Sequence, residues 1–363
     1  MDVKTMKIED LGYDGFFEAG RAKPGPDVFQ VARVVAEHRG LYKVRDADGE
    51  YSAKITGKRI FQAVSRKDYP AVGDWVEISK SGEKEAAIHS ILPRKTVIER
   101  KYSGKDEIQT IAANIDVAFV IESVGRDYNL NRIERYFAIA DGEGIRPAII
   151  LNKTDLVSQE ESDLALAEIK DRFKNVDVIA TSILTEGGLD GLKKYIAKGK
   201  TYCFLGSSGV GKSSLINGLL GGGEIKTGGI GAHSGRGKHT TTAREMYFLA
   251  QGGIVIDNPG MREVGVADAA GIGGLFEEIA VLAKKCKFVD CAHIHEPDCG
   301  VLAALESGAL DKGKYSNYIG LKKEAEHYGM TGFEKRKKDR QFGQFMKKAK
   351  KDLKNHNRKD YGG

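Results

Sequence analysis

The segment Gly206–Ser213 carries the residues of a phosphate-binding loop, because it fits the pattern G-x-x-x-x-G-K-[ST]. Glycines allow backbone N–H groups to wrap phosphates, Lys212 is expected to reach the β- and γ-phosphates, and Ser213 is expected to bind Mg²⁺. A predicted strand at 202–205 precedes the loop and a helical stretch follows it, so a chance glycine-rich turn is the weaker interpretation. The predicted phosphate-binding residues are Gly206, Ser207, Ser208, Gly209, Val210, Gly211, Lys212, Ser213 and Ser214.

A second motif, Asn-Lys-Thr-Asp at 152–155, follows a predicted strand at 148–151. The carboxylate of Asp155 can accept from the two N–H donors on the Watson–Crick edge of guanine, and adenine lacks that donor pair. The motif is weak alone and strong beside a phosphate loop. After a further strand at 176–179, backbone N–H groups at 181–182 are expected to brace the base. The predicted guanine-binding residues are Asn152, Lys153, Thr154, Asp155, Thr181 and Ser182.

Two further elements are expected to meet the γ-phosphate and its metal ion. Asp257 follows a predicted strand at 254–256 and would hold Mg²⁺ through water, while the Gly260 N–H would contact the γ-phosphate. Among the threonines at 240–242 we assign Thr241 to the Mg²⁺ shell, so the predicted Mg²⁺ residues are Ser213, Thr241 and Asp257.

The water-orienting residue must differ from that of Ras-like enzymes. Those enzymes place a glutamine just after the Asp-x-x-Gly element, and here that position is Met261, whose thioether cannot orient water. We assign the role to His239; the alternative is that it only braces the loop or contacts RNA. The predicted catalytic residues are His239, Lys212 and Thr241.

Glycine is unusually frequent, with 45 of 363 residues, and nine of them fall within 218–237. Such a segment loses much conformational entropy when it becomes ordered. We therefore expect this region, the predicted switch I, to be disordered until GTP and a partner bind.

A cysteine- and histidine-rich segment offers three thiolates and one imidazole, Cys286, Cys291, His293 and Cys299. This donor set is typical of one closed, structural zinc ion, and it predicts no open position for metal-assisted hydrolysis. His295 is a spare ligand candidate, and a cluster without metal is the alternative. Cys203, on the strand before the phosphate loop, is predicted to be a buried core residue.

Two different patterns of hydrophobic residues indicate the elements that position these motifs. Five short strands between 28 and 92 predict a small barrel such as an OB-fold, with another small β-domain as the alternative. From about residue 114, strands alternate with helices, which predicts a parallel sheet covered on both faces. Because the guanine motif precedes the phosphate loop, we infer a circularly permuted GTPase core.

Charge and composition narrow the function. The net charge of +6 reflects two basic regions: residues 334–360 carry +8 and the barrel stretch 28–100 carries +4. The tail predicts a basic amphipathic helix, for which ribosomal RNA is the favoured partner over a membrane surface or plain solvent. Because no apolar run approaches the length of a membrane span and no signal sequence is evident, we expect a cytoplasmic protein without a membrane partner. We also expect a monomer.

These motifs, in this order and spacing, resemble the circularly permuted GTPases of the ribosome small subunit-dependent GTPase A family, the RsgA/YjeQ group. The resemblance also covers Val72–Val76, Ala113–Asp116, Arg132–Tyr136 and Gly235–Thr242. It implies an N-terminal OB-fold, a permuted GTPase core, a C-terminal zinc domain and action in late maturation of the small ribosomal subunit. It also points to His239 as the catalytic histidine and to His293 as the zinc ligand.

We accordingly expect a multidomain chain, with a β-barrel (OB-fold), a central α/β P-loop GTPase domain and a C-terminal helical zinc-binding domain. The expected boundaries are an extension at 1–27, a barrel at 28–95, a GTPase domain at 96–280, a zinc domain at 281–330 and a basic tail at 331–363. The expected function is small-subunit-dependent hydrolysis of GTP to GDP and phosphate with Mg²⁺, as a late assembly checkpoint. The alternatives are a nucleotide-independent RNA-binding scaffold and a GTPase that acts on another RNA or translation target.

Overall fold

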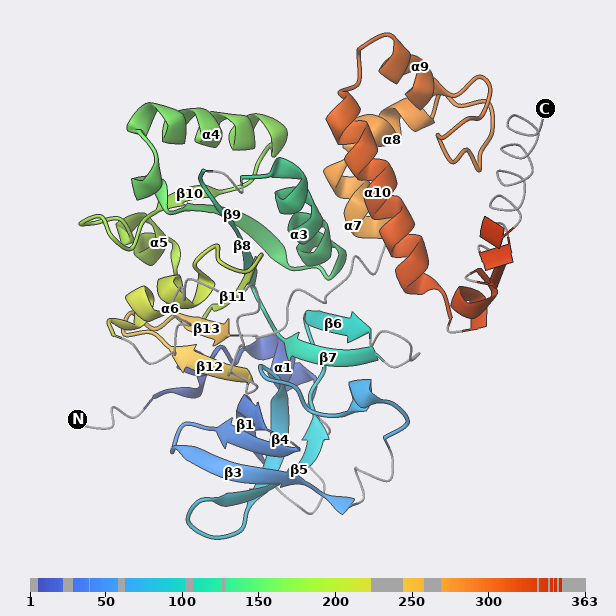
Figure 1. Cartoon of the computed structure of the whole chain (residues 1–363). Coiled ribbons are helices and arrows are strands. Elements are labelled where there is room, and N and C mark those ends of the chain that lie inside the picture. The colour runs from blue at the N-terminus through green and yellow to red at the C-terminus, as the bar shows by residue number, and fades with distance from the viewer. Residues whose placement is uncertain are drawn as a thin grey trace, which may run out of the picture.

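The computed structural model describes residues 6–21, 29–38, 40–57, 63–101, 108–125, 128–222, 244–257, 269–331, 333–338, 340–341, 343–344 and 346–347. A barrel, a central sheet with helices and a helical C-terminal unit follow one another along the chain (Figure 1). Within the described ranges, no helix combines the length and the apolar character that crossing a membrane requires.

The N-terminal barrel contains five strands, as the hydrophobic pattern predicted. They are β1 (Gln30–His38), β2 (Leu41–Arg45), β3 (Glu50–Ile55), β4 (Trp75–Lys80) and β5 (Glu85–Ile91). The hydrogen-bonded order β1-β2-β3-β5-β4 closes through a β1–β4 pairing, and only β3 and β5 run parallel. Alternate residues such as Val34, Val44 and Ile88 point inward and are fully buried, which gives the barrel its own core. This closed five-stranded arrangement confirms the predicted OB-fold.

The N-terminal segment is more ordered than the sequence suggested. We expected only an extension at 1–27, without helices, whereas a 3₁₀-helix η1 (Ile8–Leu11) and a short helix α1 (Gly15–Ala19) form there. Leu11 and Phe17 are buried against Trp75 of the barrel, and the Asp14 side chain caps α1 by accepting from Phe16 N. The expectation failed because the packing partner of these apolar residues is distant in sequence.

A hairpin that the sequence analysis did not predict connects the barrel to the next domain. It consists of β6 (Val97–Lys101) and β7 (Ile108–Ala113), paired antiparallel. At its base, the Arg94 guanidinium contacts both carboxylate oxygens of the fully buried Asp74 at 2.7 and 2.8 Å.

The central domain is a largely parallel sheet. Its strands are β8 (Val117–Ser123), β9 (Arg146–Asn152), β10 (Val178–Thr181), β11 (Thr201–Gly206), β12 (Arg244–Phe248) and β13 (Ile254–Asp257), in the order β10-β9-β8-β11-β13-β12. All neighbours are parallel except β12 and β13. Its helical elements are α3 (Leu130–Gly142), η3 (Thr154–Leu156), α4 (Gln159–Arg172), α5 (Asp190–Tyr195) and α6 (Lys212–Leu220).

Successive side chains of β8 point to opposite faces of the sheet, and both faces are covered by helices. Phe119 packs in one cluster with residues of α5 and α6, whereas Ala118 and Val120 pack in another with residues of α3 and α4. Both clusters are closed to water, which is why β8 reads as a continuous apolar run.

The barrel and the central sheet share hydrogen bonds. After Arg33, β1 no longer pairs with β4, and its second half pairs with β12 through Ala36↔Glu245 and Glu37↔Arg244. The two domains are thereby joined into one eleven-stranded sheet.

The C-terminal unit is helical. It contains α7 (Ala269–Leu275), α8 (Glu277–Ala283), α9 (Gly300–Glu306) and α10 (Lys312–Gly329). Residues of α7, α8, α9 and α10 share a hydrophobic cluster with α3, so the unit packs on one flank of the central domain (Figure 1). Further helical residues lie at 333–338, within the predicted basic tail.

Candidate functional site

The predicted nucleotide motifs lie at one edge of the central sheet. Residues 152–155 begin at the end of β9, Thr181 ends β10, Gly206 ends β11 and Asp257 ends β13. These strands are mutually parallel, so their carboxyl ends meet where ligands of open α/β sheets bind. The structure therefore brings these motifs together although about a hundred residues separate the first from the last.

The phosphate-loop candidate adopts a backbone that only glycine accommodates easily. Gly206, Gly209 and Gly211 have φ angles of +156°, +84° and +101°. A Cβ on Gly206 would lie 2.6 Å from the Ile121 carbonyl oxygen. The Val210 side chain is buried in the core, so this residue contributes only its backbone to the surface of the loop. Lys212 begins α6, and with Ser213 and Ser214 it forms the first turn of that helix, where backbone N–H groups of a helix N-terminus are able to bind an anion.

Asn152 ties the guanine-motif candidate to the phosphate-loop candidate. Its Nδ2 donates to the Val210 carbonyl oxygen at 2.8 Å, and its Oδ1 accepts from the Thr181 hydroxyl at 2.9 Å. A Cβ on Gly211 would lie 2.4 Å from the same Nδ2, so this close approach explains the glycine. The Lys153 ammonium donates to the Gly209 carbonyl oxygen at 2.6 Å. The guanine-motif candidate after β9, the end of β10 and the phosphate-loop candidate after β11 are thus fixed relative to one another.

The carboxylate of Asp155 is held by Ser182, the residue that follows β10. The Ser182 hydroxyl donates to Asp155 Oδ1 at 2.5 Å, and the backbone N–H groups of Leu184 and Thr185 donate to the Ser182 hydroxyl oxygen. Thr154 donates from its hydroxyl to the Thr181 carbonyl oxygen at 3.3 Å. Sequence reasoning gave Ser182 a backbone role only; the side-chain contact with Asp155 was missed because nothing in the local sequence signals it.

Two charged groups, Lys212 after β11 and Asp257 at the end of β13, lie close enough to interact electrostatically. The Lys212 ammonium donates to the carbonyl oxygens of Gly206 and Ser207 at 2.7 and 2.6 Å. Burial raises the pKa of Asp257, the positive charge of Lys212 opposes that rise, and Glu245 reinforces it. Glu245 lies directly opposite Asp257 in the β12–β13 ladder and was also missed by the sequence analysis.

Three predicted site residues, His239, Thr241 and Gly260, lie outside the described residues, as does most of the glycine-rich segment 218–237. Their predicted roles stay predictions. Cys203 lies at 0% exposure on β11, as predicted, and burial raises the pKa of its thiol to about 12.

The four predicted metal ligands come together in the C-terminal unit. One ligand atom from each of Cys286, Cys291, His293 and Cys299 lies within 4.8 Å of the others. The Cys286 and Cys299 sulfurs are 3.7 Å apart, and each lies 3.5 Å from His293 Nδ1. Tetrahedral zinc with Zn–S bonds of about 2.3 Å places two sulfurs about 3.8 Å apart. The cluster therefore has the geometry to hold a zinc ion.

The surrounding loop orients these ligands. His293 has a left-handed φ of +63°, and its carbonyl oxygen accepts from the Tyr315 hydroxyl of α10 at 2.7 Å. Burial lowers the pKa of His293, which keeps the imidazole neutral and able to bind metal. Backbone N–H groups at 292, 294 and 295 donate to the Glu296 carboxylate, and they lower its pKa to about 2.

Comparison with known proteins agrees with this architecture. Residues 91–267 match the family described as RsgA GTPase. The chain is 40% identical to Small ribosomal subunit biogenesis GTPase RsgA 2 of Lactiplantibacillus plantarum, over 95% of this chain and 98% of that protein. It is 38% identical to the RsgA of Opitutus terrae, over 88% and 90% of the two chains.

Solved structures show the same fold. The crystal structure of YjeQ from Thermotoga maritima matches with a TM-score of 0.61 and 26% identity, covering 82% of this chain and 99% of that one. YloQ, described as a circularly permuted GTPase, matches with a TM-score of 0.58 and 22% identity, covering 85% and 98%. The strand order, the position of the motifs and the extent of these matches together show that the chain belongs to the RsgA family of circularly permuted GTPases.

Proposed function

We propose that this GTPase hydrolyses GTP to GDP and phosphate in response to the small ribosomal subunit, and that it acts as a late checkpoint in the maturation of that subunit. The observation that carries the proposal is the position of the Asp155 carboxylate. Ser182 holds this carboxylate by a hydrogen bond, and Asn152 of the same motif binds the phosphate-loop candidate. Relatives that match nearly the whole chain are named small ribosomal subunit biogenesis GTPases. We place its action in the cytoplasm, as a monomer.

The proposed nucleotide site uses the sheet edge described above. Asp155 accepts from guanine, with Asn152, Lys153, Thr154, Thr181 and Ser182 around the base, and residues 206–214 bind the phosphates. On GTP binding, the Lys212 ammonium exchanges the carbonyl oxygens of Gly206 and Ser207 for phosphate oxygens. Ser213, Thr241 and Asp257 hold Mg²⁺, which neutralises charge on the phosphates. The Gly260 N–H contacts the γ-phosphate, and His239 orients the attacking water.

The C-terminal cluster of Cys286, Cys291, His293 and Cys299 is proposed to bind one structural zinc ion. All four ligands belong to the protein, so no open position is left for a reacting water. We propose domain boundaries at 28–95, 96–280 and 281–330, with a leading segment at 1–27 and a basic tail from 331.

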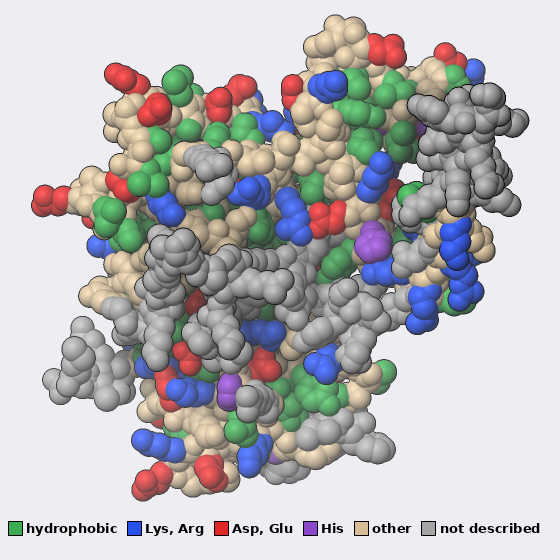
Figure 2. Space-filling model, in the orientation of Figure 1, with side chains coloured by type: hydrophobic (Ala, Val, Ile, Leu, Met, Phe, Trp, Pro, Cys, Tyr) green, Lys and Arg blue, Asp and Glu red, His purple; other side chains and the backbone are tan. Residues whose placement is uncertain are grey.

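Two basic surfaces support an RNA partner. Figure 2 shows Lys and Arg side chains gathered along the C-terminal helical segment. In that segment the described residues Lys335, Arg336, Lys337, Lys338, Arg340 and Lys347 are exposed or half-buried. Such a density of cations favours the phosphate backbone of ribosomal RNA.

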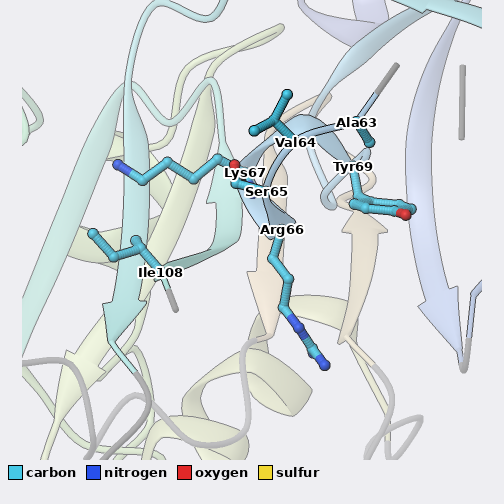
Figure 3. A pocket seen from close by; sticks show the side chains of 7 residues that line it. All are labelled: Ala63, Val64, Ser65, Arg66, Lys67, Tyr69 and Ile108. Carbon is cyan, nitrogen blue, oxygen red and sulfur yellow. Dashed lines mark hydrogen bonds between the residues drawn. The ribbon is translucent and has the colours of Figure 1, made fainter. Parts of the chain in front are cut away.

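On the barrel, a hollow of about 430 Å³ lies between the segment 63–69 and β7 (Figure 3). Arg66 and Tyr69 lie at this hollow, and Ile108 approaches it from β7. Lys67 also lines it and pairs with Glu99 at 2.8 Å. A cation and an aromatic ring beside an open hollow suit a phosphate and an unstacked base of RNA.

The test is GTP turnover with and without purified small subunits, with large subunits as the control. We expect strong stimulation by small subunits and none by large ones. Equal stimulation by both, or none, would favour a GTPase that acts on another RNA or translation target. Equal affinity of small subunits for the GDP form and for the form bound to a non-hydrolysable GTP analogue would favour a nucleotide-independent scaffold.

A single substitution tests the assignment of the phosphate loop. Lys212→Ala removes the only charge of the G-x-x-x-x-G-K-[ST] motif, and we expect turnover to fall at least about a hundredfold, the scale seen when a transition-state donor is removed. Lys174→Ala, which removes an exposed lysine paired with Asp171, is the matched control. Undiminished turnover in the Lys212 variant would disprove the site assignment.

A further inference from the structure

The strand β12 lies between the proposed nucleotide site and the barrel. Glu245 is opposite Asp257 of β13 on one side and opposite Ala36 of β1 on the other. Neighbouring strands are about 4.8 Å apart, so the Asp257 backbone is only about 10 Å from barrel strand β1 across this row. The proposed magnesium carboxylate and the barrel therefore lie within the same short run of hydrogen-bonded strands.

The side chains of the next residue pair reinforce this connection. Arg244 Nη1 donates to Glu37 Oε2 of β1 at 2.9 Å, and Nη2 donates to Gln109 Oε1 of β7 at 3.4 Å. The Arg244 and Glu37 side chains are only 14% and 21% exposed, so water screens this pair less than a surface pair. One guanidinium thus contacts both the barrel and the β6–β7 hairpin. At the other end of β12, the Arg45 guanidinium of β2 lies over the Phe248 ring at 4.8 Å.

The position of Arg244 in the chain links this contact to the proposed switch. It follows the proposed Mg²⁺ ligand Thr241 by three residues. Three residues of chain span at most about 11 Å, which is the upper limit on the separation of these two positions.

We propose that Arg244 is a positioning residue that couples the nucleotide site to the barrel through its ion pair with Glu37. When Asp257 engages the metal ion of bound GTP, the adjoining row of Glu245 on β12 and Ala36 on β1 is held in one arrangement, and loss of the γ-phosphate releases it. RNA bound to the barrel biases the same pairing from the opposite side, since coupling between two sites is reciprocal. The inference rests on the proposed role of Asp257 in nucleotide binding.

The first test needs no ribosomal partner. Amide hydrogen exchange of the peptide containing 30–38 is measured on the full chain with GDP and with a non-hydrolysable GTP analogue. In the wild type we expect exchange at Ala36–His38 to differ at least about threefold between the two nucleotides. Arg244→Ala and Glu37→Gln should each abolish that difference. Arg146→Ala, which breaks the exposed pair between Arg146 of β9 and Asp177 just before β10, should retain the difference.

The second test separates coupling from simple stabilisation. The factor by which small subunits stimulate turnover should fall about tenfold in Arg244→Ala, with an unchanged KM for GTP, and Arg244→Lys should restore part of it. The double variant with Glu37→Ala should be no worse than either single variant. The proposal would be overturned if amide exchange in β1 of the wild type were the same with both nucleotides. It would also be overturned if the difference between the nucleotides persisted in both Arg244→Ala and Glu37→Gln. Nucleotide-dependent exchange in β1 without subunit stimulation would instead disprove the proposed function and leave the coupling intact.

Discussion

The central domain is joined to its two neighbours in different ways. Toward the barrel, the joint includes main-chain hydrogen bonds of the β1–β12 ladder and the Arg94 guanidinium, which pairs with buried Asp74 and also donates to the Thr110 hydroxyl of β7 at 3.1 Å. Toward the zinc-binding unit, α3 packs on α7 and α10, and partly exposed ion pairs such as Arg135–Glu324 lie at the rim. A hydrogen-bonded ladder fixes register between two domains, whereas packed helices can shift by small amounts. The difference suggests that nucleotide state is transmitted chiefly to the barrel.

Buried polar groups at the barrel joint strengthen this contrast. The Arg33 guanidinium, at 1% exposure, donates to the carbonyl oxygens of Leu11, Gly73 and Asn114. These acceptors come from the N-terminal segment, the barrel and the connection to β8. Burial lowers the pKa of Arg33 to about 10, and the charges of Asp116 and Asp74 partly offset that effect, so the group stays charged near neutral pH.

The largest effect is expected from removing the metal of the zinc-binding unit. A structural zinc ion carries on the order of 10 kcal/mol of folding free energy in small zinc domains, so Cys299→Ala should unfold this unit. Because the described residues of this unit contribute no strand to the central sheet, GTP affinity should change less than about threefold. Metal content, limited proteolysis and GTP binding measure this. Cys203→Ala, which removes a thiol outside the cluster, should keep one zinc ion per chain, and a loss of GTP binding in Cys299→Ala would contradict the contrast between the joints.

The next effect concerns the buried ion pair of the barrel joint. Arg94→Ala leaves the carboxylate of Asp74, at 0% exposure, without its hydrogen-bonded cation, and we expect a loss of about 3–5 kcal/mol in the free energy of unfolding. Trp75 is the sole tryptophan and is fully buried in the barrel, so its fluorescence during denaturant unfolding reports this region. A change below about 1 kcal/mol, the scale of a surface pair, would show that the joint does not depend on this contact.

Close backbone packing at the same joint gives a smaller effect. Gly73 has φ of +96°, and a Cβ there would lie 2.0 Å from the Ala113 carbonyl oxygen. Gly73→Ala therefore combines left-handed strain of about 1–2 kcal/mol with a backbone clash. Gly82→Ala is the matched control, because Gly82 has φ of +108° with open space around it. The measurement is denaturant unfolding of both variants, monitored by Trp75 fluorescence. Equal losses of stability in the two variants would show that the barrel does not pack tightly against β7.

The smallest effect is expected at the rim of the zinc-binding unit. Arg135 and Glu324 are 27% and 33% exposed, and solvent screens their attraction. Arg135→Ala should cost only about 0.5–1 kcal/mol, and a double-mutant cycle with Glu324→Ala should give a coupling of the same size. A cost comparable with that of Arg94→Ala would mean that both joints depend on ion pairs to the same degree.

Local patterns carried most of the correct predictions. The five barrel strands and the α/β strands were predicted because each alternates or concentrates apolar residues within a few positions. Predicted and observed strand boundaries differ by one to three residues. For example, β1 was expected to begin at Val28 and begins at Gln30. The hairpin β6–β7 and the strand β12 were missed, because both owe their pairing to partners distant in sequence.

The sequence by itself determined which chemistry the chain carries. Motif order gave the permutation, and the spacing of Cys286, Cys291, His293 and Cys299 gave the metal cluster, since its ligands lie within fourteen residues. Only the tertiary structure decided how the parts are connected. The contact of Ser182 with Asp155, the burial of Arg33 and the ladder that joins β12 to β1 each arise between segments far apart in the chain. Such contacts depend on which surfaces the folded domains leave free, and no local pattern of residues encodes that.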